Sequence, residues 1–175
     1  MQANALLSAW TPAKDLLQGE NSAIFRTYEE LFPKDASGAR HPDRVKGLVL
    51  CGTAAKVGTT QSWNERIATI ERDGIAAIAD GIMEKWLTPA FHRKSPAELA
   101  GIRNMLIRQP VAGYVGTCAA VRDADYTADT ARIAVPTLVV VGDQDGSTPP
   151  DLVRATAERI RGARYEGIAG AGHIA

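Results

Sequence analysis

Residues 136–150 read PTLVVVGDQDGSTPP, and this stretch decides the fold class of the chain. An unbroken run of strand-forming apolar residues ends at Gly142, and two carboxylates follow it. A strand that is apolar on both sides is typical of a parallel sheet covered on both faces. We therefore predict an α/β fold in which this strand delivers Asp145 to the carboxyl edge of the sheet, where such folds bind their ligands.

A histidine, His173, follows Asp145 after an interval that can hold one helix and one strand. His173 comes after Gly170-Ala171-Gly172, and 173 − 145 = 28 residues separate it from Asp145. That interval has room for a helix starting at Thr148-Pro149 and for a weaker strand over residues 163–168. An acid and a histidine at the ends of adjacent strands form the charge-orienting half of a nucleophilic triad. Asp143 is the competing carboxylate.

The composition predicts one globular domain without a polyanionic partner. The chain has 175 residues, of which 45% are hydrophobic and 23% are charged, which suits one ordinary core. Lysine plus arginine and aspartate plus glutamate number 20 each, so the formal net charge is +0. Because nucleic acids and anionic membranes require a basic surface, we expect neither as a partner.

Cysteine usage and the first residues predict a cytoplasmic protein without a metal or cofactor. Cys51 and Cys118 lack the spacing of metal ligands, and we interpret them as small buried residues in a reducing compartment. Residues 1–7 lack the basic flank and apolar core of a signal peptide, and no apolar span reaches membrane length.

Two regions precede the acid strand. Residues 1–40 are helical in pattern, with a start at Thr11-Pro12 and a stop at Pro33, and their origin is unclear. From His41 the pattern changes, and residues 45–53 read as a second buried strand that ends in small residues.

Residues 60–131 are helical in pattern and lie between the two strands. Ser62 to Glu65 and Ser95 to Glu98 both fit the capping box of a helix start. An insertion of this length exceeds a normal crossover, so we expect part of it to form a cap over the active edge of the sheet. Trp86 is then the candidate for contact with a substrate, and membership of an apolar core is the alternative. Arg103 and Arg108 could meet a substrate carboxylate or lie in solvent.

Several segments together resemble a known family. Residues 41–51, 82–89 and 142–145, with Gly172-His173, look like the C-terminal part of 3-oxoadipate enol-lactonases. These are α/β-hydrolase-fold enzymes of bacterial aromatic degradation. The resemblance covers residues 41–175 and implies an incomplete α/β-hydrolase-type parallel sheet with a helical cap insertion at about residues 60–131.

The resemblance also implies a reaction. In that family a Ser-Asp-His centre hydrolyses 3-oxoadipate enol-lactone to 3-oxoadipate in the β-ketoadipate pathway, with no cofactor or metal. The acid motif falls on Gly142 and Asp145, and the histidine falls on His173. The nucleophile motif Gly-x-Ser-x-Gly occurs nowhere in the chain, and residues 19–23 are only its nearest imitation. We therefore assign the expected activity to the complete enzyme.

Two alternatives stay open. The first is another α/β-hydrolase specificity, such as an esterase, a different lactonase or a carbon-carbon bond hydrolase, acting on a small lactone or ester. The second is a non-catalytic half-domain whose strand at residues 45–51 has an open edge. An open edge favours association, so we expect a homo-oligomer unless residues 1–40 cover it.

Overall fold

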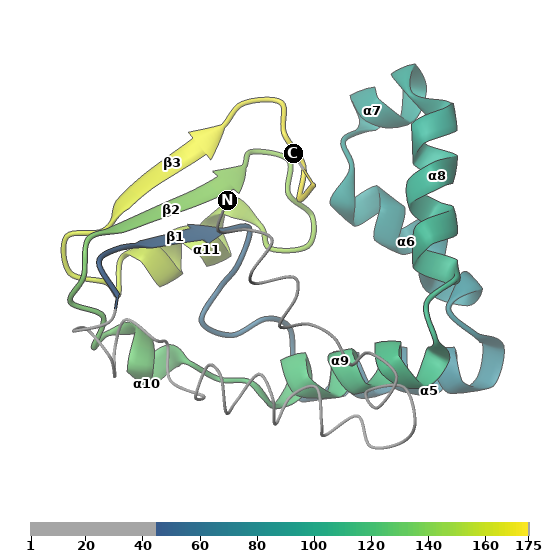
Figure 1. The fold of residues 1–175 in the computed structure, drawn as a ribbon, viewed down its shortest axis with the longest axis horizontal. Coiled ribbons are helices and arrows are strands. Elements are labelled where there is room, and N and C mark those ends of the chain that lie inside the picture. Colours follow the sequence, from purple (N-terminus) through teal and green to yellow (C-terminus); the bar gives the residue numbers. More distant parts are fainter. Residues whose placement is uncertain (1–44, 175) are drawn as a thin grey trace, which may run out of the picture.

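The structure is a computed structural model that describes residues 45–174. The predicted helix start at Thr11-Pro12, the stop at Pro33 and the change of pattern at His41 lie outside these residues. A parallel sheet forms from β1 (Leu48–Cys51), β2 (Thr137–Gly142) and β3 (Arg164–Ile168), with β2 between the other two (Figure 1). Parallel pairing brings the carboxyl ends of all three strands to one edge of the sheet.

The core under the sheet forms where β2 meets α11 (Pro150–Ala157). Val139 and Val141 lie on one side of β2 and pack against Val153 and Ala157 of the helix. These two valines and Val153 are at most 1% exposed. The apolar run of residues 137–141 therefore forms a strand, as the sequence predicts. The side chains on its other face are only half-buried, so the predicted cover on both faces is not seen among residues 45–174.

The strand predicted at residues 45–53 forms as β1, but half of the β1 side chains are exposed and not buried as predicted. Val49 is 68% exposed and Cys51 is exposed, whereas Leu50 packs against the core of β2 and α11. Successive side chains of a strand point to opposite faces, so β1 has one packed face and one exposed face within the described part of the chain. The exposure of Cys51 also corrects its interpretation as a buried residue, while Cys118 is buried as expected. Association through the edge of β1 stays a prediction.

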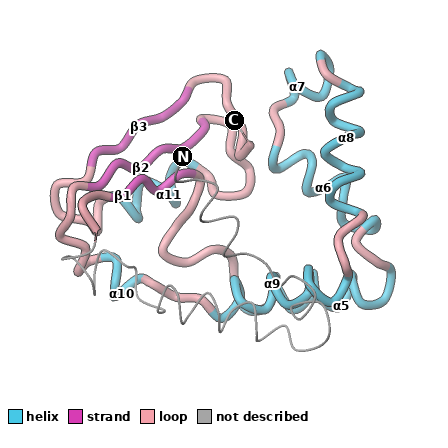
Figure 2. Tube along the Cα trace, in the orientation of Figure 1, coloured by secondary structure: helices cyan, strands magenta, loops and turns pink. Residues whose placement is uncertain are grey.

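Six helices connect β1 to β2, and Figure 2 shows them as the cyan segments outside the sheet, apart from α11. Helix α5 packs along α9, and α6 packs along α8. A separate apolar core centred on Ile70, Ala79 and Met83 holds these helices together. In Figure 1 the helices α6 and α7 lie beyond the carboxyl ends of β2 and β3. The bounds are α5 (Thr60–Asp73), α6 (Ala76–Trp86), α7 (Pro89–Lys94), α8 (Pro96–Ile107), α9 (Val111–Asp123) and α10 (Thr127–Thr130).

Both predicted capping boxes are wrong in detail. Helix α5 has Thr59 as its N-cap, and Ser62 is the third helical residue that completes the box. Thr59 has the extended backbone of an N-cap, with φ −119° and ψ 156°, whereas Ser62 is already helical. Ser95 is the N-cap of α8, as predicted, but it makes no side-chain cap bond, and its amide donates to the Phe91 carbonyl oxygen at the end of α7.

No helix among residues 45–174 is long and apolar enough to span a membrane.

Candidate active site

The loop after β2 buries the carboxylate of Asp145 and satisfies it locally. Asp145 is 3% exposed. Its Oδ1 accepts hydrogen bonds from the amides of Ser147 and Thr148, both at 2.8 Å. The hydroxyl of Thr148 donates to Oδ2 at 2.9 Å. An aspartate that bonds the amides two and three residues ahead is typical of a turn, so the sequence Asp-Gly-Ser-Thr shapes this loop by itself.

His173 completes the set of groups around this carboxylate. The imidazole Nδ1 lies 2.9 Å from Asp145 Oδ2, and the His173 side chain is 26% exposed. An ionised carboxylate only accepts hydrogen bonds, so Nδ1 carries the proton in this contact. In the neutral imidazole, Nε2 is then left as a proton acceptor. A histidine in this tautomer can act as a general base.

The environment of Asp145 keeps its carboxyl ionised. Burial by itself raises the pKa of Asp145, but hydrogen bonds from His173, Thr148 and Ser147 stabilise the charged form and together outweigh burial. The pKa of Asp145 is therefore lowered from its usual value. An acid held ionised beside Nδ1 stabilises the imidazolium that forms when Nε2 takes a proton.

The competing carboxylate, Asp143, has a different place. Its Oδ1 accepts a hydrogen bond at 2.9 Å from the amide of Gly170, and its own amide donates to the Ile168 carbonyl oxygen. Asp143 therefore ties the loop before His173 to the end of β2. The structure brings Asp145, and not Asp143, to the imidazole.

Two glycines leave room for the approach of the acid and histidine loops. A Cβ at Gly142 would overlap the backbone oxygens of Ala171 and Gly172. Gly52, at the end of β1, has φ +53°, and a Cβ there would lie 3.2 Å from His173 Nδ1. Only glycine meets both demands at position 52, namely a left-handed backbone and space for the ring.

The end of α6 holds both loops. The Lys85 carbonyl oxygen accepts a hydrogen bond from the Gly146 amide at 3.1 Å. The Trp86 carbonyl oxygen accepts hydrogen bonds from the amides of His173 and Ile174, at 2.9 and 3.1 Å. The rings of Trp86 and His173 also stack, with centroids 6.4 Å apart and an interplanar angle of 29°. Trp86 therefore lies beside the imidazole, and its contact with a substrate stays a proposal.

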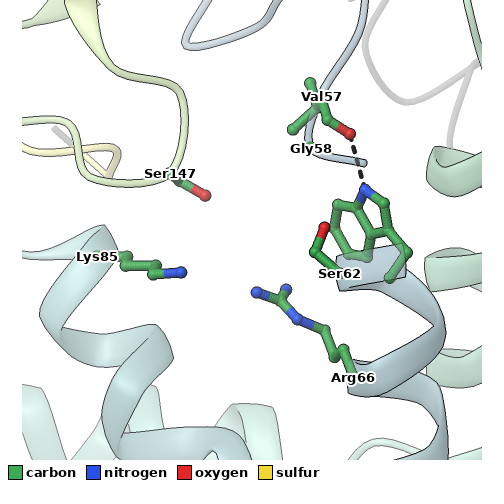
Figure 3. A pocket seen from close by; sticks show the side chains of 7 residues that line it. Val57, Gly58, Ser62, Arg66, Lys85 and Ser147 are labelled. Atoms are coloured by element: carbon green, nitrogen blue, oxygen red, sulfur yellow. Dashed lines mark hydrogen bonds between the residues drawn. The ribbon is translucent and has the colours of Figure 1, made fainter. Parts of the chain in front are cut away.

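A pocket of about 150 Å³ opens beside these loops, between α5, the end of α6 and the acid loop. Figure 3 shows the side chains of Arg66 and Lys85 pointing into it from two helices, with Ser147 on a third side. We call it the cation pocket because the cationic side chains of Arg66 and Lys85 line it. The sequence analysis did not predict this pocket, because no motif links its residues, which come together only through helix packing. Its lining consists of Val57, Gly58, Ser62, Trp63, Arg66, Lys85 and Ser147.

The two arginines singled out from the sequence lie elsewhere. Arg103 donates to Asp80 at 2.6 Å on the surface of the cap, and Arg108 is exposed at the end of α8. Neither lines the cation pocket. Among residues 45–174, no cluster of histidine, cysteine and acidic side chains is arranged to hold a metal ion.

Comparisons with known proteins find relatives both by sequence and by structure. The chain is 33% identical to 3-oxoadipate enol-lactonase 2 of Acinetobacter baylyi over 107 residues, which are 61% of the chain and 40% of the relative. An enol-lactonase structure from Burkholderia xenovorans LB400 matches with a TM-score of 0.73 and 34% identity, over 78% of the chain and 52% of the relative. No protein-family model matches. The resemblance to enol-lactonases is confirmed.

The fold class follows from the solved structures. An alpha/beta hydrolase enzyme from a Medee basin deep-sea metagenome, MGS-M2, matches with a TM-score of 0.67 at 19% identity, over 87% of the chain and 63% of the relative. The chain has a partial α/β-hydrolase fold. It spans 40% of the length of the curated enol-lactonase that it matches. The α/β-hydrolase fold places the Asp145 and His173 loops at the carboxyl edge of its parallel sheet, as the sequence predicted.

Proposed function

We propose that Asp145 and His173 are the acid and the histidine of a Ser-Asp-His centre that hydrolyses 3-oxoadipate enol-lactone to 3-oxoadipate. The observation that carries the proposal is the 2.9 Å contact between His173 Nδ1 and the buried Asp145 carboxylate. The similarity to enol-lactonases supports the substrate. The activity is proposed for the complete protein, in the cytoplasm, with a small lactone as its partner and no cofactor.

In the proposed reaction the two ring nitrogens of His173 have different roles. Asp145 holds Nδ1–H, so Nε2 faces the reactants as a base. Nε2 removes the proton of a serine hydroxyl while the serine oxygen attacks the lactone carbonyl carbon. The acyl carbon–oxygen bond then breaks, and the imidazolium gives its proton to the departing enolate oxygen, whose enol becomes the ketone. Water, deprotonated by the same Nε2, then attacks the acyl carbon, and the imidazolium returns this proton to the serine oxygen as the ester bond breaks and the acid is released.

The sequence has no recognisable motif for the serine nucleophile of the proposed Ser-Asp-His centre. The 175 residues contain no Gly-x-Ser-x-Gly. The position of β1 supports a place for such a serine: β1 is an edge among the strands that the structure describes, and a Cβ at Gly52, just after β1, would lie 3.2 Å from His173 Nδ1. A further parallel strand paired with β1 would end beside Gly52, with its following loop facing Nε2.

The test compares substrates on the complete protein. With 3-oxoadipate enol-lactone and p-nitrophenyl acetate as competing substrates, we expect a higher kcat/KM for the lactone by at least about a hundredfold, which is about 2.7 kcal/mol of transition-state binding. A preference for the simple ester would replace the enol-lactonase assignment with an esterase. The isolated chain should give no burst of acyl-enzyme with the activated ester.

A further inference from the structure

We propose that residues 24–32 of this chain form an amphipathic helix that docks on the face of the sheet opposite α11. These residues lie outside the part of the chain that the structure describes, so the grounds are the described sheet face and the amino-acid sequence. The inference concerns an interaction surface and is independent of the proposed function. We call this surface the open sheet face, and it consists of Val49, Cys51, Leu138, Val140 and Ile168.

The strand register places these side chains together. Val139 and Val141 pack against α11, so the alternate side chains of β2 point to the other face. Register-paired residues of neighbouring strands point to the same face of a sheet. The pairs on the open sheet face are Val49 with Leu138, Cys51 with Val140, and Ile168 with Gly142.

Residues 45–174 leave much of the open sheet face in contact with solvent. Val49 is 68% exposed and Ile168 is 43% exposed, and Cys51 is exposed as well. Leu138 and Val140 are half-buried. The helix that packs on β2 and β3, α11, lies on the other face (Figure 1). Because a sheet in a globular domain buries its apolar faces against another layer, this face indicates a further covering segment.

A segment with the matching pattern precedes the sheet in the sequence. Its apolar residues recur at steps of one, three and four residues, which places them on one side of a helix. Arg26 and Glu30 fall on the opposite side of such a helix, and Pro33 directly after it is a stop signal. The apolar residues are Ile24, Phe25, Tyr28, Leu31 and Phe32.

The open sheet face has the size of one short helix. Strands lie about 4.8 Å apart and residues rise about 3.3 Å along them, so the 3-stranded sheet spans roughly 10 by 13 Å between Leu138 and Gly142. Residues 24–32 as a helix would be about 13 Å long and about 10 Å wide. A stable interface between two proteins covers about 800 Å² on each partner, which is several times this area. The size therefore favours a single helix over a second copy of the chain.

The connection to the sheet also favours this segment. Since β1 begins at Leu48, residues 33–47 form the link between the segment and the sheet. A link of this length reaches up to about 50 Å, which is several times the length of the open sheet face. A segment tethered in this way has an effective concentration on the order of millimolar, so it outcompetes a free second copy at micromolar concentration.

Docking on the face leaves the edge of β1 free. The unpaired backbone groups of an edge strand lie in the plane of the sheet, whereas the docked side chains stand perpendicular to it. The further parallel strand of the proposed function can therefore pair with β1 while residues 24–32 cover the open sheet face. Failure of either proposal leaves the other intact.

The test uses Cys51 as a probe, because its thiol lies on the open sheet face whereas Cys118 is buried. The full chain is treated with iodoacetamide under native conditions, and labelling of Cys51 is followed by peptide mass spectrometry. The double variant Tyr28→Ser with Leu31→Ser loses apolar contacts to the sheet, so Cys51 should be labelled at least about tenfold faster than in the unaltered chain. Arg26→Ser with Glu30→Ser is the matched control and should leave the labelling rate unchanged.

Disulfide formation tests which side of the helix meets the sheet. Tyr28→Cys or Leu31→Cys should form an intramolecular disulfide with Cys51 on mild oxidation in dilute solution, in preference to Glu30→Cys. The proposal is overturned if the two serine pairs and the unaltered chain label Cys51 at the same rate, or if Glu30→Cys forms the disulfide as readily as the apolar positions. Protection of Cys51 that increases with protein concentration would also overturn it, because the cover would then be a second copy of the chain.

Discussion

The backbone carbonyl oxygen of Trp86 accepts a hydrogen bond from the amide of His173 at 2.9 Å, so the last residue of α6 holds the loop that carries the imidazole. The preceding residue, Lys85, holds the acid loop in the same way through Gly146. The end of α6 therefore holds the acid loop and the histidine loop next to each other.

The close contact at Gly142 predicts a strong destabilisation by alanine. A Cβ at Gly142 would overlap backbone oxygens, which cannot rotate away as a side chain can, so Gly142→Ala should lower the free energy of unfolding by about 1–3 kcal/mol. Gly81→Ala is the matched control, because nothing lies within 4 Å of a Cβ at this position in α6. Chemical denaturation should show the control as stable as the unaltered chain, or slightly more stable. Equal losses in the two variants would refute the loop contact.

The hydroxyl of Thr148 supports the charge on Asp145. Thr148→Val keeps the shape of the side chain and removes the donor to Oδ2, so the pKa of Asp145 should rise and the free energy of unfolding should fall by about 1–2 kcal/mol. Thr117→Val, an exposed threonine on α9, is the control for the same chemical change. Carbon-13 NMR titration of the Asp145 carboxyl measures the pKa directly. An unchanged pKa in Thr148→Val would show that the hydroxyl contributes nothing to the charged form.

The lowered pKa of Asp145 predicts a pH dependence of stability. Its folded-state pKa lies below the unfolded value of about 3.9, so the unfolded state binds the proton more readily. The stabilisation is therefore fully present above the unfolded pKa and is lost as the pH falls through the folded pKa. The difference in free energy of unfolding between the unaltered chain and Asp145→Asn should shrink as the pH is lowered from 7 to about 3. A difference that is constant over this range would contradict the lowered pKa.

The β2 strand and the acid loop could be predicted from the sequence because their signals are local. The apolar run of residues 137–141 needs only its own composition to be placed in the interior, and the Asp145 turn is closed by its own next residues. The proximity of His173 followed from strand order alone. The single-sided burial of β1 could not be predicted, because Val49 and Leu50 are equally apolar and only the position of α11 distinguishes them.

The cation pocket could not be predicted for a similar reason. Arg66 and Lys85 are ordinary helical residues in the sequence, on faces that look solvated. Their convergence depends on the angle between α5 and α6 and on the Gly146 amide, which brings the acid loop to Lys85. Arg103, which the sequence analysis named as a candidate for contact with a substrate carboxylate, pairs with Asp80 instead.

The most direct test of the catalytic proposal measures kcat for 3-oxoadipate enol-lactone in the complete protein carrying Asp145→Asn or Asp143→Asn. The amide at position 145 no longer stabilises the imidazolium or selects the Nδ1–H tautomer, so kcat should fall by at least about a thousandfold with KM little changed. Asp143→Asn alters only the loop contact to Gly170 and should retain kcat within about tenfold. Full activity in Asp145→Asn, or an equal loss in the two variants, would contradict the assignment of Asp145 as the acid of the centre.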